Sequence, residues 1–589
     1  MCGIFAYIGE GRDATKAVFN GLKRLDYRGY DSWGISIVEK GEIKTQKYIG
    51  EINRKLLTLG RSRSAIGHTR WATNGTVTQI NAHPHTSSDK SYVLAHNGIV
   101  ENFTKLKSFL SKKGYKFISD TDTEVILRLI EYEYRNEKDF IISVQNAFNK
   151  LDGRNTIIIL KKEGEVIAVR NGSPLVVGIS EKNNDVYFSS DTLSFSQYVD
   201  KTITLENGQM AICNDKLTII NTKDNNEVTV NYDVNTIKGQ EYSKDGFRHF
   251  MIKEIHEEPQ IIEKVMLQSK KNILKLANKI KNSTTVYCIG SGTAGAAAFQ
   301  SAYYLRTFGG INAIALIGAE AKDYFHLFKK SDLIIALSQS GETADTLEVI
   351  EFAKKVGVCI ASYVNMPGSL MTKISDYKFM ANAGPEICVM STKVFVSQIV
   401  WGYLLSKVVQ GKFYDGLSNL RKTKTAVSKL LKDKILDKKL DKIATKLSYE
   451  KDLFLLAKGQ NLQIIREGMI KLVEGGYIHA HAIPAGDLKH YAITLMEPGK
   501  YLISVISDDE NKTDTMNAIN EVKARGASVI GISVFPDKIY DEYIQVANLG
   551  ETSAILNIIP LQLLAYKIAV LKGNNVDKPR NIAKSVTVK

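Results

Sequence analysis

The sequence predicts an α/β protein, with a sheet-rich first region and a doubly wound second region. Three patterns carry this prediction. Up to about residue 235, short β-type runs alternate with Gly, Asn and Asp turn signals. After Lys238, long helical patterns alternate with short, continuously apolar runs, which are typical of strands buried on both faces of a parallel sheet. Part of the second pattern is repeated further along the chain, which indicates a duplicated domain.

The first region contains seven predicted strands and a predicted helix near residues 123–134. The strands are expected at Ile4–Ile8, Gly34–Val38, Tyr92–His96, Thr156–Leu160, Val166–Arg170, Val186–Ser189 and Met210–Cys213. This content indicates a domain of α/β or α+β type with extensive sheet.

The second region contains predicted parallel strands at Thr285–Ile289, Asn312–Ile317 and Leu333–Leu337. Its repeat shows as two pairs of segments, VYCIG with LIIALSQSGETADT and LFLLAKG with YLISVISDDENKTDT. The spacing from Gly290 to Asp345 is the same as that from Gly459 to Asp514, 55 residues. Two homologous α/β domains are the simplest account, and a chance alignment of two doubly wound domains is the alternative.

We therefore expect several domains in the 589-residue chain, since one domain usually holds ~100–200 residues. The expected segments are residues 1–238, a connector with the first doubly wound domain at 239–430, the second at 431–575, and a C-terminal tail at 576–589. A hydrophobic content of 44% and only 10 prolines exclude collagen-like and largely disordered chains.

The formal net charge of +15 fits either nucleic-acid binding or attraction of small phosphorylated metabolites. The basic residues are not concentrated in one patch. The densest stretch, residues 421–446, interleaves lysines with apolar residues at helical spacing and predicts a solvated helix face. We therefore expect no nucleic-acid partner.

No segment is expected to span a membrane. The longest apolar stretch, Val394–Val409, is interrupted by Ser397, Gln398, Ser406 and Lys407, well short of the ~20 apolar residues that a span needs, and it predicts a buried helix. The first ten residues carry no basic segment followed by an apolar one, so the cytoplasm is the expected compartment.

Cys2 stands apart from the other four cysteines. Five scattered cysteines without a C-x-x-C pair indicate neither a disulfide framework nor a cysteine zinc site. Removal of Met1 would leave the Cys2 thiol beside its own free α-amine, whose reference pKa of ~7.7–8.0 suits a general base at neutral pH. A cysteine at position two can also be an accident, and its surroundings decide between these interpretations.

Six segments within the first 125 residues resemble, in order and spacing, the glutaminase domain of class II glutamine amidotransferases. They are CGIFAYIG, YRGYDSWG, GHTRWATNG, NAHPH, HNGIVEN and SDTDTEV. The resemblance implies an N-terminal nucleophile hydrolase fold with αββα layers. It also implies that Cys2 attacks the side-chain amide of glutamine, while the Asn97 side chain and the Gly98 backbone N–H stabilise the oxyanion.

The same resemblance implies how glutamine is bound. Arg70 would hold its α-carboxylate, because a planar guanidinium suits a carboxylate, and Asp122 would hold its α-ammonium. Trp71 and Thr73 lie in the segment that closes over glutamine in this family. Two structural alternatives stay open, a core position for Trp71 and a helix N-cap at Asp122 before residues 123–134.

Three histidines, His83, His85 and His96, raise the question of a metal site. Their spacing differs from the H-x-x-x-H of a helical zinc site, and the resemblance makes them structural. We expect no metal and no cofactor.

Two Gly- and Ser-rich turns in the second region predict a phosphate site. GSGTAG (290–295) and SQSGETADT (338–346) each follow a buried strand and open a helix, so backbone N–H groups and a helix N-terminus can bind an anion. Hydroxyls at Ser338, Ser340 and Thr343 add donors. A glycine-rich turn alone also occurs in many dinucleotide sites.

The Ser-rich turn resembles that of sugar isomerase (SIS) domains. With GFRHFMIKEIHEEP as connector and DKPRNIAKSVTVK as tail, the whole chain is similar to the isomerising glutamine–fructose-6-phosphate aminotransferase family. The resemblance implies that L-glutamine and fructose 6-phosphate give glucosamine 6-phosphate and glutamate, with ammonia channelled between the two reactions. It also implies a homodimer, in which the histidine matching His490 comes from the neighbouring subunit.

Residues for the sugar half follow from the family pattern. Those expected at the sugar phosphate are Thr293, Ser338, Gln339, Ser340, Thr343 and Ser391. Glu474 would move a proton between C1 and C2, His490 would open the cyclic sugar, Lys584 would form a Schiff base at C2, and Lys471 would assist proton transfer. Taken alone, Lys471 and Glu474 could simply pair on a solvated helix face.

The chain departs from the common family pattern at a few positions. Ala294 removes one hydroxyl from the sugar-phosphate site, Asn74 replaces a frequent histidine in the glutamine-binding loop, and Tyr491–Ala492 replaces a frequent Gly-Pro. Trp33 stands where many members have a small residue. Every proposed catalytic residue is nevertheless present.

Other functions remain to be distinguished from this one. Another glutamine-dependent amidotransferase, phosphoribosyl or asparagine-forming, would need a pyrophosphate- or ATP-binding region, and no GxxxxGK[ST] motif occurs in the sequence. A phosphosugar sensor with a vestigial glutaminase would not need Cys2, Glu474, His490 and Lys584 together. A deaminase would not need the glutaminase domain.

Overall fold

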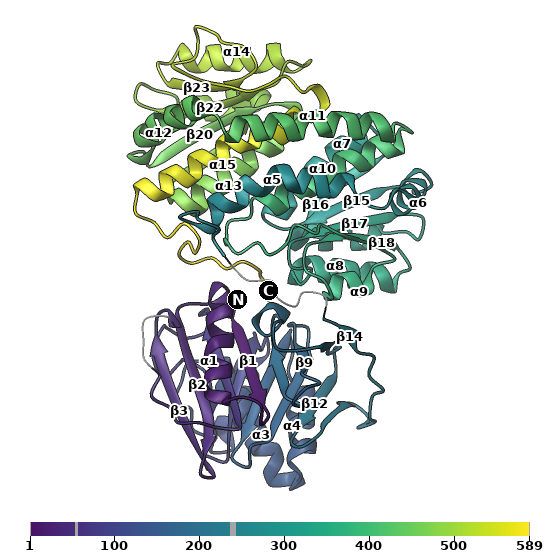
Figure 1. Ribbon diagram of the computed structural model, residues 1–589, viewed down its shortest axis with the longest axis vertical. Coiled ribbons are helices and arrows are strands. Elements are labelled where there is room, and N and C mark those ends of the chain that lie inside the picture. The colour runs from purple at the N-terminus through teal and green to yellow at the C-terminus, as the bar shows by residue number, and fades with distance from the viewer. Residues whose placement is uncertain (1, 53–56, 236–242, 588–589) are drawn as a thin grey trace. The chain divides into compact units, whose positions relative to one another are not determined.

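The computed structural model describes residues 2–52, 57–235 and 243–587. The chain divides into two compact units, unit 1 with Met1–Glu241 and Ser585–Lys589, and unit 2 with Tyr242–Lys584 (Figure 1). The predicted domain boundary at residue 238 and the predicted loss of Met1 lie outside the described residues, as do the last two residues of the predicted tail.

Unit 1 contains two antiparallel sheets. The first has the order β14-β11-β9-β10-β1-β4-β2-β3 and is built from β1 (Gly3–Ile8), β2 (Ser32–Glu39), β3 (Glu42–Ile49), β4 (Ser64–Arg70), β9 (Val176–Ile179), β10 (Val186–Ser189), β11 (Lys201–Thr204) and β14 (Asp233–Val234). The second has the order β13-β12-β8-β7-β6-β5 and is built from β5 (His85–Thr86), β6 (Tyr92–Gly98), β7 (Asn155–Lys161), β8 (Val166–Asn171), β12 (Gln209–Cys213) and β13 (Leu217–Asn221).

Alternation along the strands builds the αββα layers. On β1, Ile4 and Ile8 enter the core between the two sheets, whereas Phe5 and Tyr7 enter the core that faces α1 (Ala14–Leu25). On the second sheet, α3 (Asp122–Glu137) and α4 (Phe140–Asn149) cover the outer face, and α2 (Phe103–Lys112) packs beside α3. The expected αββα fold is therefore confirmed.

All seven predicted strands of this unit are present, but several others were not predicted. β3 has a partly exposed, largely polar sequence, EIKTQKYI, that hides its alternation. β4 is buried at every residue although it contains Ser, His, Thr and Arg, so its polar residues masked a central strand. Its last residue, Arg70, is a predicted glutamine-binding residue, and residues at such a site need not follow the apolar pattern of a strand.

Unit 2 contains two five-stranded parallel sheets with the same topology, β16-β15-β17-β18-β19 and β21-β20-β22-β23-β24. The first is built from β15 (Val286–Gly290), β16 (Ala313–Ile317), β17 (Leu333–Ser338), β18 (Cys359–Val364) and β19 (Tyr377–Met380). The second is built from β20 (Asp452–Ala457), β21 (His479–Pro484), β22 (Tyr501–Ile506), β23 (Ser528–Ser533) and β24 (Glu542–Gln545). The identical order confirms the doubly wound, duplicated architecture.

One large core joins the two sheets of unit 2, because strand and helix residues of both halves belong to a single buried cluster. Its helices include α5 (Phe250–Met266), α7 (Thr293–Thr307), α10 (Lys393–Val409), α13 (Leu462–Gly476) and α15 (Ser553–Leu571), which lie between the sheets in Figure 1. The helix α6 (Lys270–Lys281) packs against α10 in the same core, whereas α8 (Ala344–Lys355), α9 (Leu370–Ile374) and α14 (Lys512–Lys523) cover the other faces of the sheets.

The predicted buried helix at Val394–Val409 is confirmed, since every residue of α10 is buried. However, it is not the longest apolar helix. Within the described residues, Gly550–Leu571 is long and apolar enough to cross a membrane by length and composition, and 78% of its most apolar window is buried inside the unit. Asn557 and Gln562 interrupt this stretch in the sequence, which concealed its length.

The lysine-rich stretch at residues 421–446 belongs to two helices, α11 (Phe413–Leu431) and α12 (Lys434–Ser448). Asp433 separates them and caps α12, because its carboxylate accepts the backbone N–H groups of Ile435 and Leu436. Leu440 and Ile443 are buried as expected, but Ile435 is 83% exposed because it lies in the first turn of the new helix.

Candidate active sites

Cys2 lies immediately before β1, at the centre of the larger sheet of unit 1. The antiparallel pairing of β1 with β4 aligns Gly3 with Thr69 and so brings Cys2 beside Trp71. The Trp71 backbone N–H donates to the Cys2 Sγ at 3.3 Å. Burial raises the pKa of the Cys2 thiol above its ordinary value. A nearby base is therefore needed before this thiol can act as a nucleophile.

Asn97 and Gly98 end β6 next to Cys2. The Asn97 Nδ2 donates to the Cys2 backbone carbonyl at 3.2 Å, which places an amide donor beside the thiol residue. Gly98 has a φ of +150°, and a Cβ there would lie 2.4 Å from the Arg154 carbonyl oxygen. This position therefore requires glycine.

His68 determines how the Asn97 amide is turned, and the sequence did not single it out. Its Nε2 lies 3.1 Å from the Asn97 Oδ1 and 3.0 Å from the His96 carbonyl oxygen. Both partners are acceptors, so Nε2 carries the proton and donates. Burial lowers the pKa of His68 to about 3, so the ring is neutral. The Asn97 amide oxygen is therefore held away from Cys2, and the Asn97 N–H₂ is held toward Cys2.

Arg70, at the end of β4, supports the following loop. It is buried, and its guanidinium donates to the carbonyl oxygens of Asn74 at 2.5 Å and Gly75 at 3.1 Å. Thr73 is exposed and Trp71 is partly exposed, so the alternative that Trp71 is a core aromatic is wrong. Sequence patterns pointed to Arg70 but did not show that it braces the loop expected to close over glutamine.

Asp122 is the first residue of α3 rather than its N-cap, so the structural alternative for this residue is also wrong. Its Oδ2 accepts the backbone N–H of Val100 at 2.8 Å. Burial lowers the pKa of Arg70, and the charges of Cys2, Asp31 and Asp122 oppose that effect, which places all four groups in one electrostatic environment.

The three histidines proposed as structural are hydrogen-bonded to neutral partners. His96 contacts the Thr123 hydroxyl at 3.0 Å, His83 contacts the same hydroxyl at 3.2 Å, and His85 contacts the Thr121 hydroxyl at 3.2 Å. Burial lowers the pKa of each, so all three are neutral rings. Within the described ranges, no three His, Cys, Asp or Glu side chains are grouped as metal ligands.

In unit 2 the predicted phosphate turn connects β17 to α8. Ser338 ends the strand, and Thr343 is the N-cap residue of the helix. The Gly341 N–H donates to the Ser338 Oγ at 2.9 Å, and the Glu342 N–H donates to the Ser340 Oγ at 3.1 Å. The backbone carbonyl of Gln339 accepts from Asn365 and Met366, so the turn is fixed. Hydroxyls and the N-terminus of a 12-residue helix therefore converge here.

A second cluster lies on α13, where Lys471 is fully buried. Its Nζ contacts the Glu474 Oε2 at 2.6 Å, Glu467 at 3.3 Å and the Thr293 hydroxyl at 3.2 Å. Burial raises the pKa of Glu467 to about 7, while burial of Lys471 is outweighed by Glu467 and Glu474, so its pKa lies above the ordinary value. The alternative of a solvated Lys471–Glu474 pair is therefore wrong. Glu467 was not predicted, although its i, i+4 spacing to Lys471 places both on one helix face.

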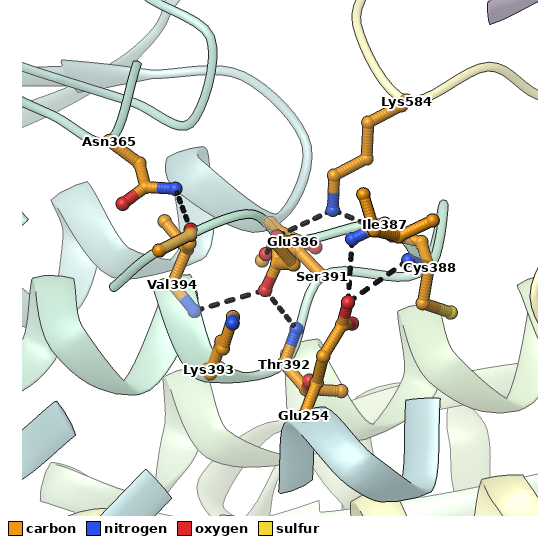
Figure 2. Close-up of polar contacts among 12 residues, drawn as sticks. Glu254, Asn365, Glu386, Ile387, Cys388, Ser391, Thr392, Lys393, Val394 and Lys584 are labelled. Atoms are coloured by element: carbon orange, nitrogen blue, oxygen red, sulfur yellow. Dashed lines mark hydrogen bonds and ion pairs between the residues drawn. The ribbon is translucent and has the colours of Figure 1, made fainter. Parts of the chain in front are cut away.

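A third cluster surrounds Lys584 (Figure 2). Its Nζ donates to the Glu386 Oε2 at 2.5 Å and to the Cys388 carbonyl oxygen at 2.7 Å. The Ser391 hydroxyl donates to the same carboxylate at 2.8 Å. Ser391 and Lys584, both predicted, are therefore joined by Glu386, which was not predicted. Its only signal in the sequence is its place five residues before the STK motif.

His490 is not joined to these clusters in the single chain. It is the exposed last residue of a 3-10 helix, Ala485–His490. Among the described residues it forms no hydrogen bond or ion pair with Lys471, Glu474 or Lys584. The neighbouring Tyr491 is 48% exposed, and its hydroxyl lies 3.4 Å from the His481 Nε2.

Known proteins resemble the two units separately and the chain as a whole. A glutamine amidotransferase domain model matches residues 68–197, and an SIS domain model matches residues 279–407 and 446–572. A glutamine–fructose-6-phosphate aminotransferase [isomerizing] of Fusobacterium nucleatum is 36% identical, and one of Thermococcus kodakarensis is 37% identical, each over 100% of both chains. A crystallised C-terminal domain of glucosamine-fructose-6-phosphate aminotransferase from Francisella tularensis is 29% identical, with a TM-score of 0.53, over 57% of this chain and 100% of that one.

Proposed function

The chain belongs to the isomerising glutamine–fructose-6-phosphate aminotransferase family, and we propose that it converts fructose 6-phosphate and glutamine to glucosamine 6-phosphate and glutamate. The observation that carries this proposal is the presence, on one chain, of a thiol beside an oriented amide donor in unit 1 and of a buried lysine–carboxylate site and a serine-rich turn at a helix N-terminus in unit 2. The first arrangement suits amide hydrolysis, and the second suits chemistry on a phosphorylated sugar.

In unit 1, Cys2 attacks the side-chain amide of glutamine. The Asn97 N–H₂, held by His68, and the Gly98 N–H stabilise the oxyanion. Arg70 and Asp122 bind the α-carboxylate and the α-ammonium of glutamine, and Trp71 and Thr73 close over it. A free α-amine on Cys2 supplies the base that the buried thiol needs.

In unit 2, the turn at Ser338–Thr343 binds the sugar phosphate, with Thr293 and Ser391 near the sugar. Lys584 forms a Schiff base with the C2 carbonyl, and Glu474 moves the proton between C1 and C2. Lys471, held as an ammonium between Glu467 and Glu474, assists that transfer. No cofactor is required for these steps, because each is a proton transfer or a carbonyl addition.

We further propose that the enzyme is a cytoplasmic homodimer. The exposure of His490, and the lack of a hydrogen bond or ion pair between it and Lys471 or Lys584 among the described residues, supports a site completed by the partner's copy of this histidine. In the dimer this imidazole opens the cyclic sugar. Ammonia passes from the first reaction to the second without release into bulk water, where it would be protonated.

The test is formation of hexosamine 6-phosphate from fructose 6-phosphate, with glutamine or with ammonium as nitrogen donor, for the native chain and for Cys2→Ala. We expect product with glutamine from the native chain and none from the variant, while ammonium supports both. Intact-mass measurement shows whether Met1 has been removed.

Two results would contradict the proposal. If glutamine is hydrolysed but neither donor gives an amino sugar, unit 2 has another acceptor or only senses sugar phosphates. If Cys2→Ala retains the glutamine-dependent reaction, Cys2 is not the nucleophile. Sedimentation equilibrium checks the dimer separately.

A further inference from the structure

Glu386 is held more firmly than an ordinary buried carboxylate. It is 3% exposed, and both of its oxygens have partners. Oε1 accepts the backbone N–H groups of Thr392 and Val394, each at 3.0 Å, and Oε2 accepts from the Ser391 hydroxyl and the Lys584 Nζ. Figure 2 shows Lys584 extending from the C-terminal segment onto this carboxylate. The geometry therefore fixes one oxygen at 2.5 Å from the lysine nitrogen.

A second buried carboxyl nearby is in the opposite protonation state. Glu254, on α5, accepts the backbone N–H groups of Ile387 at 2.6 Å and Cys388 at 3.2 Å through Oε1. Burial and the charge of Glu386 raise the pKa of Glu254 to about 8, so it is neutral at pH 7. Burial also acts to raise the pKa of Glu386, but the Lys584 ammonium and the backbone donors outweigh it and hold that pKa below its ordinary value. Environments that separate two carboxyl groups in this way mark different roles.

Few groups could take a proton from Lys584. Within the described part of the chain, its Nζ contacts the Glu386 carboxylate and the Cys388 carbonyl oxygen, and of these only the carboxylate binds a proton at ordinary pH. Two other buried lysines of this region have carboxylates of their own, since Lys393 is paired with Glu257 at 2.6 Å and Lys471 with Glu474 at 2.6 Å. Among the described residues, Lys584 is therefore the lysine that an ion pair joins to Glu386.

On the premise that Lys584 forms the Schiff base of the proposed function, we propose that Glu386 is a further catalytic residue, which accepts a proton from the Lys584 ammonium and returns it when water leaves. The proton first moves from Nζ to the Glu386 Oε2, leaving a free amine. The amine attacks the C2 carbonyl of the open ketose, so that an N–C bond forms and the C–O π bond breaks. A proton from the nitrogen passes to the new alkoxide, which gives a neutral carbinolamine.

Dehydration then reverses the role of the carboxyl. Glu386 gives its proton to the carbinolamine hydroxyl, the C–O bond breaks, and water leaves as the nitrogen lone pair forms the iminium. Overall, an ammonium and a ketone become an iminium and water, and Glu386 returns to its carboxylate form. The nitrogen is cationic at the start and at the end, so the same carboxylate is its counter-ion in both states.

The test is borohydride trapping of the iminium on Lys584, followed by peptide mass spectrometry, with fructose 6-phosphate and the full-length enzyme. We expect Glu386→Gln to lower the trapping rate by about 10²-fold or more, the usual contribution of a positioned acid–base group. Glu254→Gln is the matched control, because it makes the same isosteric change to a neighbouring buried carboxyl that is already neutral. We expect it to trap within about twofold of the native rate.

Chemical rescue separates proton transfer from simple support of the lysine. Formate should raise the trapping rate of Glu386→Ala at least tenfold. Formamide has the same shape as formate but no basic oxygen, so it should not raise that rate. The pH profile of trapping in Glu386→Ala with formate should follow formate ionisation.

Each contrary outcome has one meaning. If the native enzyme gives no adduct on Lys584, the proposed role of Lys584 fails, and this inference fails with it. If the native enzyme traps but Glu386→Gln traps at the same rate, the inference alone fails. It also fails if Glu386→Gln and Glu254→Gln are slowed equally, or if formate and formamide rescue equally, because each result indicates a structural role.

Discussion

The two candidate sites solve the same problem, activation of a buried nucleophile, in opposite ways. In unit 1 the groups hydrogen-bonded to Cys2 are neutral, the Asn97 amide and the Trp71 backbone, and the charges of Arg70 and Asp31 act on its thiol in opposite directions. In unit 2, Lys471 and Lys584 are buried among carboxylates. A thiol becomes a nucleophile by losing a proton and gaining charge, whereas a lysine is charged until it gives a proton away. The difference teaches that the surroundings of each site match the charge of its nucleophile at rest.

The largest effect is expected from removal of the Lys584 amine, which should impair the reaction of unit 2 and not that of unit 1. Lys584→Met keeps an unbranched side chain, one atom shorter, that cannot form a Schiff base, so amino sugar formation should fall by at least about 10³-fold. Glutamine hydrolysis, measured as glutamate release without sugar phosphate, should stay within about twofold. Equal loss of both activities would show that the two sites are not chemically independent.

The next effect tests the neutral donor of unit 1. Asn97→Ala removes one oxyanion donor, so kcat for glutamine hydrolysis should fall by about 10²–10³-fold. Ammonia-dependent amination of fructose 6-phosphate should be unchanged, because that reaction does not use Cys2. A change in KM without a change in kcat would instead mean that Asn97 only binds glutamine.

A smaller effect is expected at His68, which contacts Asn97 rather than the thiol. His68→Phe keeps the ring but removes the Nε2–H donor, so the Asn97 amide is free to turn. We expect kcat for glutamine hydrolysis to fall about tenfold, since removal of a positioning partner commonly costs 10–100-fold. Combined with Asn97→Ala it should add nothing, because the two residues act as one unit. Additive losses would show that His68 acts by another route.

The smallest effect concerns stability, and the two units should respond to pH in opposite directions. Burial lowers the pKa of His68 to about 3, so between about pH 3 and 6.5 the unfolded chain binds more protons at this ring than the folded one. The contribution of this histidine to stability therefore falls as pH falls below about 6.5. The pKa of Glu254 is raised to about 8 in the folded chain, whereas in the unfolded chain it lies near about 4.3. Between these values only the folded chain holds the proton, so the contribution of Glu254 to stability falls as pH rises toward 8.

Thermal inactivation at several pH values measures how the stability of each unit depends on pH. Glutaminase activity reports unit 1, and ammonia-dependent amination reports unit 2. At pH 5 the half-inactivation temperature of unit 1 should fall more than that of unit 2. At pH 8.5 the half-inactivation temperature of unit 2 should fall more than that of unit 1. Glu254→Gln should flatten the alkaline loss of unit 2 by a few degrees and leave unit 1 unchanged. Parallel slopes in the native enzyme would contradict the comparison.

Local patterns were sufficient for most of the architecture. Apolar runs such as Val186–Ser189 are strands because their alternation or continuous burial is set by neighbours within a few residues. The partly exposed edge strand β3 and the polar central strand β4 were not predicted by these local patterns. The polar pattern of β3 reflects its position at the edge of the sheet, and that of β4 reflects its place at the candidate site. Hydrophobic periodicity encodes neither of these causes.

The sequence by itself determined the two α/β regions and the family to which the motifs point, and it singled out Cys2 and Ser338–Thr343 as the proposed nucleophile and the proposed phosphate turn, because each depends on residues close together in the chain. Only the tertiary structure decided that His68 turns Asn97, that Glu467 faces Lys471 and that Glu386 holds Lys584, which is 198 residues away. The physical reason is that charge state depends on burial and on distances between remote segments. A carboxylate in a sequence carries no sign of whether folding will leave it in water or against an ammonium.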